Sequence, residues 1–192
     1  MMSQTIVKME GISKAFAGIK ALDNVQIDLR QGEIHALMGE NGAGKSTLMK
    51  IMTGVYSRDS GKMYLQNASS NQLEEVEIKS PLAAQKLGLS MVFQEFNLLE
   101  NMNIAENIFI GREPLGAGQT VDKKQLIQNA AVELKKVNLD IDPSTEVSKL
   151  SCGQKQCVEI GKSLSYNARV VVYAEPTAGL SEREECGTDC QY

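Results

Sequence analysis

A run of consecutive residues has the types and the spacing needed to hold a phosphate chain. It fits the pattern of Gly, four residues, Gly, Lys and then Ser or Thr, and it comprises Gly39, Glu40, Asn41, Gly42, Ala43, Gly44, Lys45, Ser46 and Thr47. Its glycines allow successive backbone N–H groups to point at a phosphate. Lys45 supplies a positive charge for the β- and γ-phosphates, and the Ser46 hydroxyl is suited to bind Mg²⁺. The run therefore predicts a site for a nucleoside triphosphate.

The segments on either side of this loop predict how it is positioned. Residues 34–38, Ile-His-Ala-Leu-Met, form an apolar run that indicates a buried strand. Residues 45–54 carry apolar side chains at helical spacing and end at Gly54, which indicates a helix. The N-terminus of that helix would add unpaired N–H groups and the positive end of its dipole to the loop. The alternative is a glycine-rich turn with a chance Lys-Ser, which the strand and the helix disfavour.

Composition indicates an ordinary globular domain. With 192 residues, of which 42% are hydrophobic and 23% charged, the chain predicts one domain with its own core. A net charge of −4 without a dense basic tract does not suggest a nucleic-acid partner. No apolar run approaches the roughly 18 residues of a membrane span, and the N-terminus lacks a secretory signal, so we expect a cytoplasmic location. Reduced thiols without zinc-site spacing are expected at Cys152, Cys157, Cys186 and Cys190.

Hydrophobic periodicity and turn residues predict the remaining elements. Strands are expected over residues 5–10, 24–30, 62–66, 76–78, 89–93 and 170–173. Helices are expected from Pro81, over residues 103–110 and 122–137, and from Ser151 to about Ser165, with Asp122 and Ser151 as N-terminal caps. Phe16 falls in a polar turn region, where its ring either stacks on a nucleotide base or packs in the core.

Several motifs follow one another in an order that resembles the ATP-binding subunits of ABC transporters. Residues 92–95, Val-Phe-Gln-Glu, are similar to the family's glutamine loop, and residues 150–154, Leu-Ser-Cys-Gly-Gln, to its signature. Residues 170–175, followed by Pro-Thr, resemble its second nucleotide motif. The amino-acid sequences of residues 32–37, 94–99 and 158–160 resemble those of the family's sugar-import branch, of ribose, galactose and xylose type.

The resemblance implies an α/β fold of the P-loop NTPase class. Its parts are an N-terminal antiparallel β subdomain, a RecA-like parallel core and a helical signature subdomain, with the core sheet incomplete at the C-terminus. Residues 1–192 would form a single incomplete nucleotide-binding domain. The antiparallel part is expected at residues 1–31 and 60–80, the core at 32–59, 88–94 and 166–181, the helical part at 95–165 and an atypical tail at 182–192.

The resemblance also implies a role for each residue around the nucleotide. Phe16 would stack on adenine. The backbone of residues 41–46 would hold the phosphates together with Lys45, and Thr47 would contact the α-phosphate. The groups that would reach Mg²⁺ are Ser46 and Gln94.

Catalysis and partners are implied in the same way. Glu175 would be the general base for the attacking water. The signature would act on ATP held by a second nucleotide-binding domain, through Ser151, Cys152, Gly153 and Gln154. Together with that second domain, the expected partners are the membrane permease subunits of an importer, which puts the chain on the inner face of the cell membrane.

Three features depart from the family pattern. Ala174 stands where the family has an Asp that helps to hold Mg²⁺, which predicts weak Mg²⁺ binding and slow hydrolysis. Cys152 stands where Gly is commonest, a change that this branch tolerates. The sequence stops soon after Ser181, before the family's next strand and its switch histidine, and the only histidine, His35, is predicted to pack within the strand over 34–38.

The lack of that strand predicts either a fold of low stability or a visibly split parallel sheet, because buried unpaired backbone groups cost on the order of 1–3 kcal/mol each. The leading hypothesis is an ATP-binding subunit of a sugar importer that is impaired in hydrolysis. One alternative is a nucleotide-binding fragment without catalytic activity. The other is a soluble ABC ATPase outside transport, which the lack of a basic surface disfavours.

Overall fold

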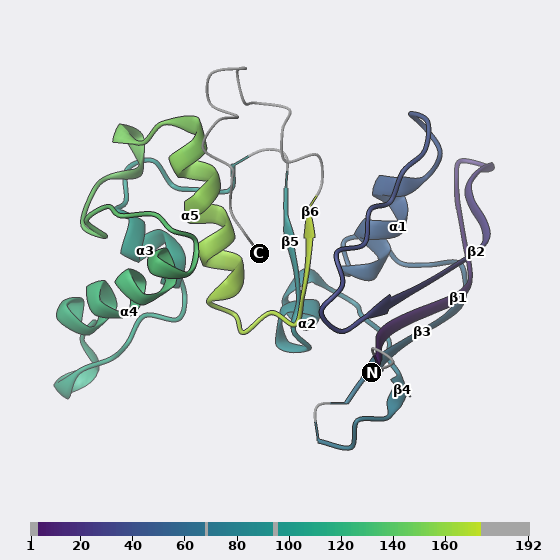
Figure 1. Ribbon diagram of the computed structural model, residues 1–192, viewed down its shortest axis with the longest axis horizontal. Helices are drawn as coiled ribbons and strands as arrows, with labels where there is room; N and C mark the ends of the chain where they lie inside the picture. The colour runs from purple at the N-terminus through teal and green to yellow at the C-terminus, as the bar shows by residue number, and fades with distance from the viewer. Residues whose placement is uncertain (1–3, 68, 94–95, 174–192) are drawn as a thin grey trace. The chain divides into compact units, whose positions relative to one another are not determined.

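The computed structural model describes residues 4–67, 69–93 and 96–173 (Figure 1). The chain divides into two compact units, Met1–Leu87 and Gly88–Tyr192. In the described residues one sheet is antiparallel and the other is a parallel pair, and helices accompany both. The predicted α/β class with an antiparallel part and a parallel part is confirmed.

The first unit is built on a four-stranded antiparallel sheet in the order β2-β1-β3-β4. Its strands are β1 (Thr5–Phe16), β2 (Ile19–Arg30), β3 (Ser60–Gln66) and β4 (Leu73–Glu75). Ala17 and Gly18 join β1 to β2 with φ angles of 47° and 85°, which is the left-handed backbone that a two-residue hairpin turn requires. Both strands are longer than predicted, because pairing continues up to this turn. The prediction that Phe16 lies in a separate turn region is therefore wrong, since it ends β1.

Two helices belong to the first unit. In α1 (Lys45–Met52), Leu48, Ile51 and Met52 are buried along one face. This helix ends two residues before the predicted end, and Gly54 follows it with a φ of 72°, so glycine stops the helix as predicted. In α2 (Pro81–Lys86), proline occupies the first turn and the side chain of Ser80 accepts a hydrogen bond from the Ala83 N–H.

Two predicted strands of this unit are wrong. Residues 34–38 are not a strand, and the side chains of Ile34 and Met38 are 86% and 88% exposed. A parallel strand forms only where neighbours complete its hydrogen bonds, and no described residue pairs with this segment. Residues 76–78 are also not a strand. Pairing with β3 begins earlier, at Leu73 after the turn closed by the Asn67 N–H and the Gln72 carbonyl, and β4 ends at Glu75, with one further hydrogen bond from the Val76 N–H to the Met63 carbonyl at 2.9 Å.

The second unit contains a parallel pair of strands, β5 (Leu89–Val92) and β6 (Val170–Tyr173), which were both predicted. Leu89 lies opposite Val170, and Val92 lies opposite Tyr173. The expectation of an incomplete parallel sheet is confirmed for the described residues, since this sheet has two strands and residues 34–38 belong to neither sheet.

The helices of this unit are α3 (Ile104–Phe109), α4 (Lys123–Lys136) and α5 (Cys152–Leu164), with short 3₁₀ turns η1 (Ala117–Gln119) and η2 (Val147–Lys149). Asp122 caps α4 by accepting a hydrogen bond from the Gln125 N–H, as predicted. Asn103 and Glu106 form a capping box at the start of α3.

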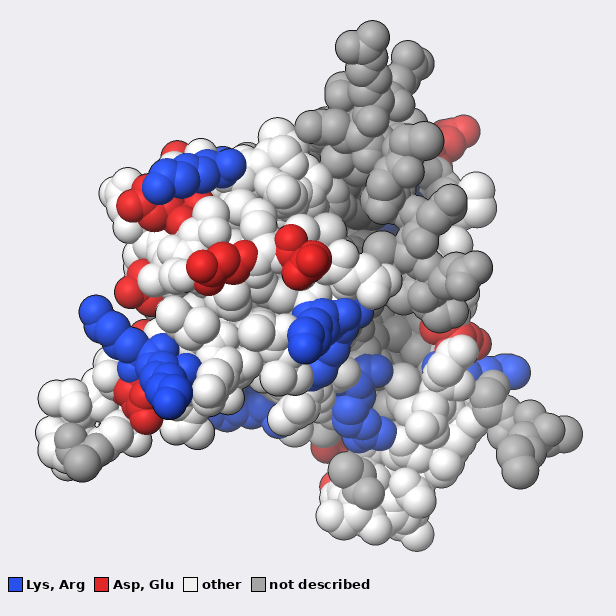
Figure 2. All heavy atoms as spheres, turned by 60° about the vertical axis from the view of Figure 1, so that its left-hand side comes forward, with Lys and Arg blue, Asp and Glu red and all other residues white. Residues whose placement is uncertain are grey.

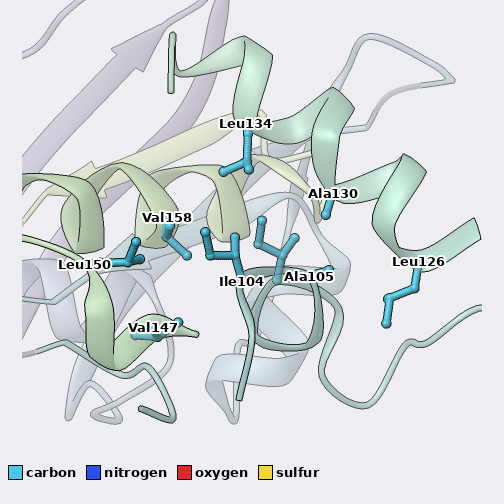
Figure 3. Close-up of a cluster of buried hydrophobic side chains, with 9 residues drawn as sticks. Ile104, Ala105, Leu126, Ala130, Leu134, Val147, Leu150 and Val158 are labelled. Carbon is cyan, nitrogen blue, oxygen red and sulfur yellow. The ribbon is translucent and has the colours of Figure 1, made fainter. Parts of the chain in front are cut away.

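The three helices share one apolar core (Figure 3). Leu126, Ala130 and Leu134 lie on the inner face of α4, at the spacing that predicted an amphipathic helix. They face side chains from α3, α5, η2 and the residue that follows η2, namely Ile104, Ala105, Ile108, Val147, Leu150 and Val158. This core holds the start of α5, where the signature lies.

Charges of both signs cover the surface. On the face shown in Figure 2, basic and acidic side chains are interspersed rather than gathered into one patch of a single sign. Several are paired, including Lys136 with Glu133 on α4 at 2.8 Å between Nζ and Oε2. Among the described residues, no helix is both long and apolar enough to cross a membrane.

Candidate nucleotide-binding site

The phosphate loop ends in unpaired backbone N–H donors at the start of α1. Gly44 is the N-cap residue of α1 in a left-handed conformation, and no side chain caps the helix. The first intrahelical bond recorded at this end runs from the Leu48 N–H to the Gly44 carbonyl at 2.9 Å. Within the described chain, the N–H groups of residues 45–47 donate to no acceptor. An uncapped helix start with unpaired N–H groups is the local arrangement that binds a phosphate.

The charged amino group of Lys45 is hydrogen-bonded to the same loop. Its Nζ donates hydrogen bonds to the carbonyl oxygens of Gly39 at 2.6 Å and of Glu40 at 2.8 Å. Because an ammonium group has three donors, one N–H remains for a further acceptor. Ser46 and Thr47 follow Lys45 in the first turn of α1. The residues present therefore fit a triphosphate, and Ser46 offers a hydroxyl to Mg²⁺.

Two glycines of the loop are needed for different reasons. Gly42 and Gly44 both have a φ of 87°, which favours glycine. A Cβ at Gly42 would meet nothing within 4 Å. A Cβ at Gly44 would lie 2.5 Å from the carbonyl oxygen of Ala21 and 2.7 Å from Cδ2 of Leu22. Gly44 therefore lets the loop lie directly against β2.

Phe16 is not a core residue. Its side chain is 41% exposed at the end of β1, which contradicts the core alternative. The ring meets Tyr56 in an edge arrangement, with centroids 5.3 Å apart and an interplanar angle of 66°. Lys14 Nζ lies 5.6 Å from the centroid of Phe16. The stacking of a base on Phe16 stays a prediction, and the structure leaves its ring accessible for that purpose.

The signature forms the first turn of α5. Ser151 and Gln154 make a reciprocal capping box, in which the Ser151 Oγ accepts from the Gln154 N–H at 3.3 Å and the Gln154 Oε1 accepts from the Ser151 N–H at 2.9 Å. The N–H groups of Cys152 and Gly153 have no acceptor in the part of the chain that the structure describes. A Cβ at Gly153 would meet nothing within 4 Å. The signature thus presents two backbone donors on an open surface.

A buried carboxylate behind the signature ties α5 to the segment that follows residue 95. The Glu159 Oε1 accepts a hydrogen bond from the Asn97 N–H at 2.7 Å, and Lys162 Nζ donates to the Asn97 carbonyl at 3.0 Å. Burial raises the pKa of Glu159, against the opposing effects of Lys162 and the Asn97 N–H. Asn107, which is 1% exposed, binds both backbone groups of Leu99.

Sequence reasoning missed these supporting residues. Tyr56, Asn107 and Glu159 belong to no phosphate or signature motif, and each acts on a segment through the tertiary structure. By contrast, the sequence alone predicted Ser151 as the N-terminal cap of a helix, and α5 confirms this prediction. For Tyr56 the only signal was an aromatic residue soon after the helix that follows the loop.

Other predicted residues are placed differently or not described. His35 is exposed rather than packed in a strand, and its Nδ1 lies 3.3 Å from Glu33 Oε1. This prediction fails because residues 34–38 form no strand. Gln94, Ala174 and Glu175 lie outside the described residues, as do Cys186 and Cys190. Neither Cys152 nor Cys157 is in a disulfide among the described residues, and no group of three or more His, Cys, Asp or Glu there could hold a metal ion.

This chain belongs to the ABC transporter family, because the family model described as "ABC transporter" matches residues 22–178. ATPases of this family bind ATP with Mg²⁺. The chain is 48% identical over 183 residues to the putative ribose/galactose/methyl galactoside import ATP-binding protein 2 of Burkholderia cenocepacia (strain HI2424), which covers 95% of this chain. It is 44% identical over 185 residues to the xylose import ATP-binding protein XylG of Geobacillus kaustophilus (strain HTA426), again over 95% of the chain. In both cases the chain spans 35% of the relative's length.

Solved structures agree with this assignment. A nucleotide-free ATP-binding cassette from an ABC transporter matches 93% of this chain and 72% of its own, with a TM-score of 0.77 and 29% identity. A dimeric ATP-binding cassette in a post-hydrolysis state, bound to ADP and Pi, matches 93% of this chain and 78% of its own, with a TM-score of 0.69 and 26% identity.

Proposed function

We propose that this chain is the ATP-binding part of a subunit that energises sugar import by an ABC transporter. The observation that carries the proposal is the start of α1, where unpaired N–H groups of residues 45–47 and the Lys45 amino group converge at an uncapped helix. The relatives are named as import ATP-binding proteins for ribose, galactose or xylose, and these names support a sugar as the imported substrate.

Each site residue has a proposed role. The backbone of residues 41–46 and the side chain of Lys45 hold the phosphates. Thr47 contacts the α-phosphate, and Phe16 stacks on adenine. Mg²⁺ is held by Ser46 and Gln94, and Glu175 accepts the proton of the attacking water. The signature, through the N–H groups of Cys152 and Gly153, acts on ATP bound by a second nucleotide-binding domain.

The proposed partners and location follow from this role. A second nucleotide-binding domain would pair with this chain, and permease subunits would hold both at the inner face of the cell membrane. We propose for the antiparallel, core and helical parts the residue ranges expected from the sequence.

Ala174 favours a second candidate function, which is nucleotide binding with slow hydrolysis. A carboxylate before Glu175 would help to hold Mg²⁺, and alanine has no oxygen to offer. Replacement Ala174→Asp is expected to raise steady-state turnover of ATP more than threefold. A smaller rise would exclude Ala174 as the cause of slow hydrolysis.

Titration of the full chain with ATP, with and without Mg²⁺, tests the binding site itself. Lys45→Ala is expected to weaken ATP binding about tenfold to a hundredfold, since a hydrogen bond to a charged group is worth about 1.5–3 kcal/mol. Lys62→Ala is the matched control, because Lys62 pairs with Glu75 on the antiparallel sheet. Equal affinities for ATP in the wild type, Lys45→Ala and Lys62→Ala would overturn the proposed site. Co-purification with permease subunits tests the transport role.

A further inference from the structure

Tyr56 is joined to the phosphate-loop helix on one side and to Phe16 on the other. The N–H groups of Val55 and Tyr56 donate to the Lys50 carbonyl of α1 at 2.8 and 3.0 Å. The Lys50 Nζ lies 5.3 Å from the centroid of the Tyr56 ring. The ring of Tyr56 then meets Phe16 in the edge arrangement described above. One short turn thus connects the helix that starts at the phosphate loop with the aromatic ring at the end of β1.

Asp59, in the same turn, fixes the backbone just before Phe16. Its Oδ2 accepts a hydrogen bond from the Ala15 N–H at 2.8 Å, and its Oδ1 accepts one from Lys14 Nζ at 2.7 Å. Its own N–H donates to the Ser13 carbonyl at 2.9 Å. Asp59 therefore holds the end of β1 at three consecutive residues, while Tyr56 contacts the Phe16 ring.

We propose that Tyr56 is a positioning residue that orients the Phe16 ring to stack on the base of a bound purine nucleotide, with Asp59 fixing the backbone beneath it. This inference rests on the proposed function, in which Phe16 stacks on the base. An edge contact with a neighbouring ring limits rotation and leaves part of the Phe16 ring surface accessible. Since the Tyr56 N–H is hydrogen-bonded to Lys50 of α1, the ring contact connects Phe16 on β1 to the helix that begins at the phosphate loop, which is about 12 Å long.

Affinities for a nucleotide and for a ligand without a base separate this role from general support of the fold. Dissociation constants are measured for Mg-ATP and for Mg-tripolyphosphate in the wild type, Tyr56→Leu and Tyr56→Phe. Tyr56→Leu is expected to weaken ATP binding about three- to tenfold and to leave tripolyphosphate binding unchanged. Tyr56→Phe keeps the edge contact and is expected to retain wild-type affinity for ATP.

The matched control is Tyr64→Leu, which makes the same change on β3 at a residue whose ring, among the described residues, makes no contact with the Phe16 ring. It is expected to change neither affinity. A double-mutant cycle with Phe16→Leu adds a second criterion, because Tyr56→Leu should have no further effect once the ring of Phe16 is gone. Equal losses for ATP and tripolyphosphate in Tyr56→Leu, or additive effects in the cycle, would overturn the proposal.

A measurement without nucleotide distinguishes failure of this proposal from failure of the proposed function. The four phenylalanines are labelled with fluorine, and the Phe16 signal is assigned from Phe16→Leu. Tyr56→Leu is expected to shift and narrow the Phe16 resonance, because the edge contact with a ring is lost, whereas Tyr64→Leu leaves it unchanged. If Tyr56→Leu leaves the resonance unchanged, Tyr56 does not orient Phe16. If the resonance responds but the wild type binds no ATP, the proposed function fails, and with it the role of this ring in base stacking.

Discussion

Replacement Gly44→Ala is expected to destabilise the first unit more than the same change at Gly42. An alanine at a φ of 87° costs about 1–2 kcal/mol at either position. At Gly44 the added methyl group would also lie 2.5 Å from the carbonyl oxygen of Ala21, which belongs to β2 and cannot rotate away. Such overpacking adds about 1–3 kcal/mol. The total for Gly44→Ala is about 2–5 kcal/mol, against about 1–2 kcal/mol for Gly42→Ala.

The two glycines make a controlled comparison. Their φ angles are the same, and the same change is made in both, so the loss of flexibility in the unfolded chain cancels between the two variants. Only the surroundings differ, because a Cβ at Gly42 meets nothing within 4 Å. The difference in unfolding free energy therefore isolates the contact between the loop and β2.

Urea titrations of the full chain, followed by far-UV circular dichroism, measure this difference through the midpoint and slope of unfolding. Gly32→Ala serves as a second control, since Gly32 has a φ of 72° and open space around it. Equal destabilisation by Gly44→Ala and Gly42→Ala would refute the reasoning. It would mean that the added methyl group at residue 44 is accommodated without a clash against β2.

Three further predictions concern buried or paired polar groups. Asn107→Ala is expected to destabilise the second unit by about 2–4 kcal/mol in urea titration, because it leaves the Leu99 N–H without its acceptor; a loss below about 0.5 kcal/mol would contradict this. Burial raises the pKa of Glu159 above 4.5, so the stability of the wild type relative to Glu159→Gln should fall as pH rises through and above 4.5, and a flat difference would argue against a buried carboxylate. Lys14 and then the Ala15 N–H lower the pKa of Asp59 below 3.8, so the advantage of the wild type over Asp59→Asn should be present above pH 3.8 and disappear as pH falls below it; thermal melts across this range would show no such loss if the pair were unimportant.

Elements with local signals could be predicted from the sequence. The caps at Asp122 and Ser151 and the proline at the start of α2 are interactions between residues within one turn. The periodicity of α4 likewise reports its own buried face. Such signals do not depend on what the rest of the chain does, and the helices they predict are confirmed within one or two residues.

Two predicted strands failed because a strand forms only where another segment pairs with it. Residues 34–38 are as apolar as β5 and β6, yet they form no strand because no described residue supplies their hydrogen bonds. Residues 76–78 show the same limit on a smaller scale, since the turn before β4 decides where pairing begins. Whether a segment forms a strand therefore depends on the neighbouring segments that supply its hydrogen bonds as well as on its own sequence.

The sequence by itself determined the family and the residues of the phosphate loop, because glycine, lysine and hydroxyl side chains at fixed spacing specify their own local geometry. Only the tertiary structure decided that Gly44 lies against β2, that Phe16 is an accessible ring in edge contact with Tyr56, and that Glu159 is buried against Asn97. The last contact joins residues 62 positions apart. Contacts of that kind depend on how the elements pack, and no pattern within a short stretch of chain encodes them.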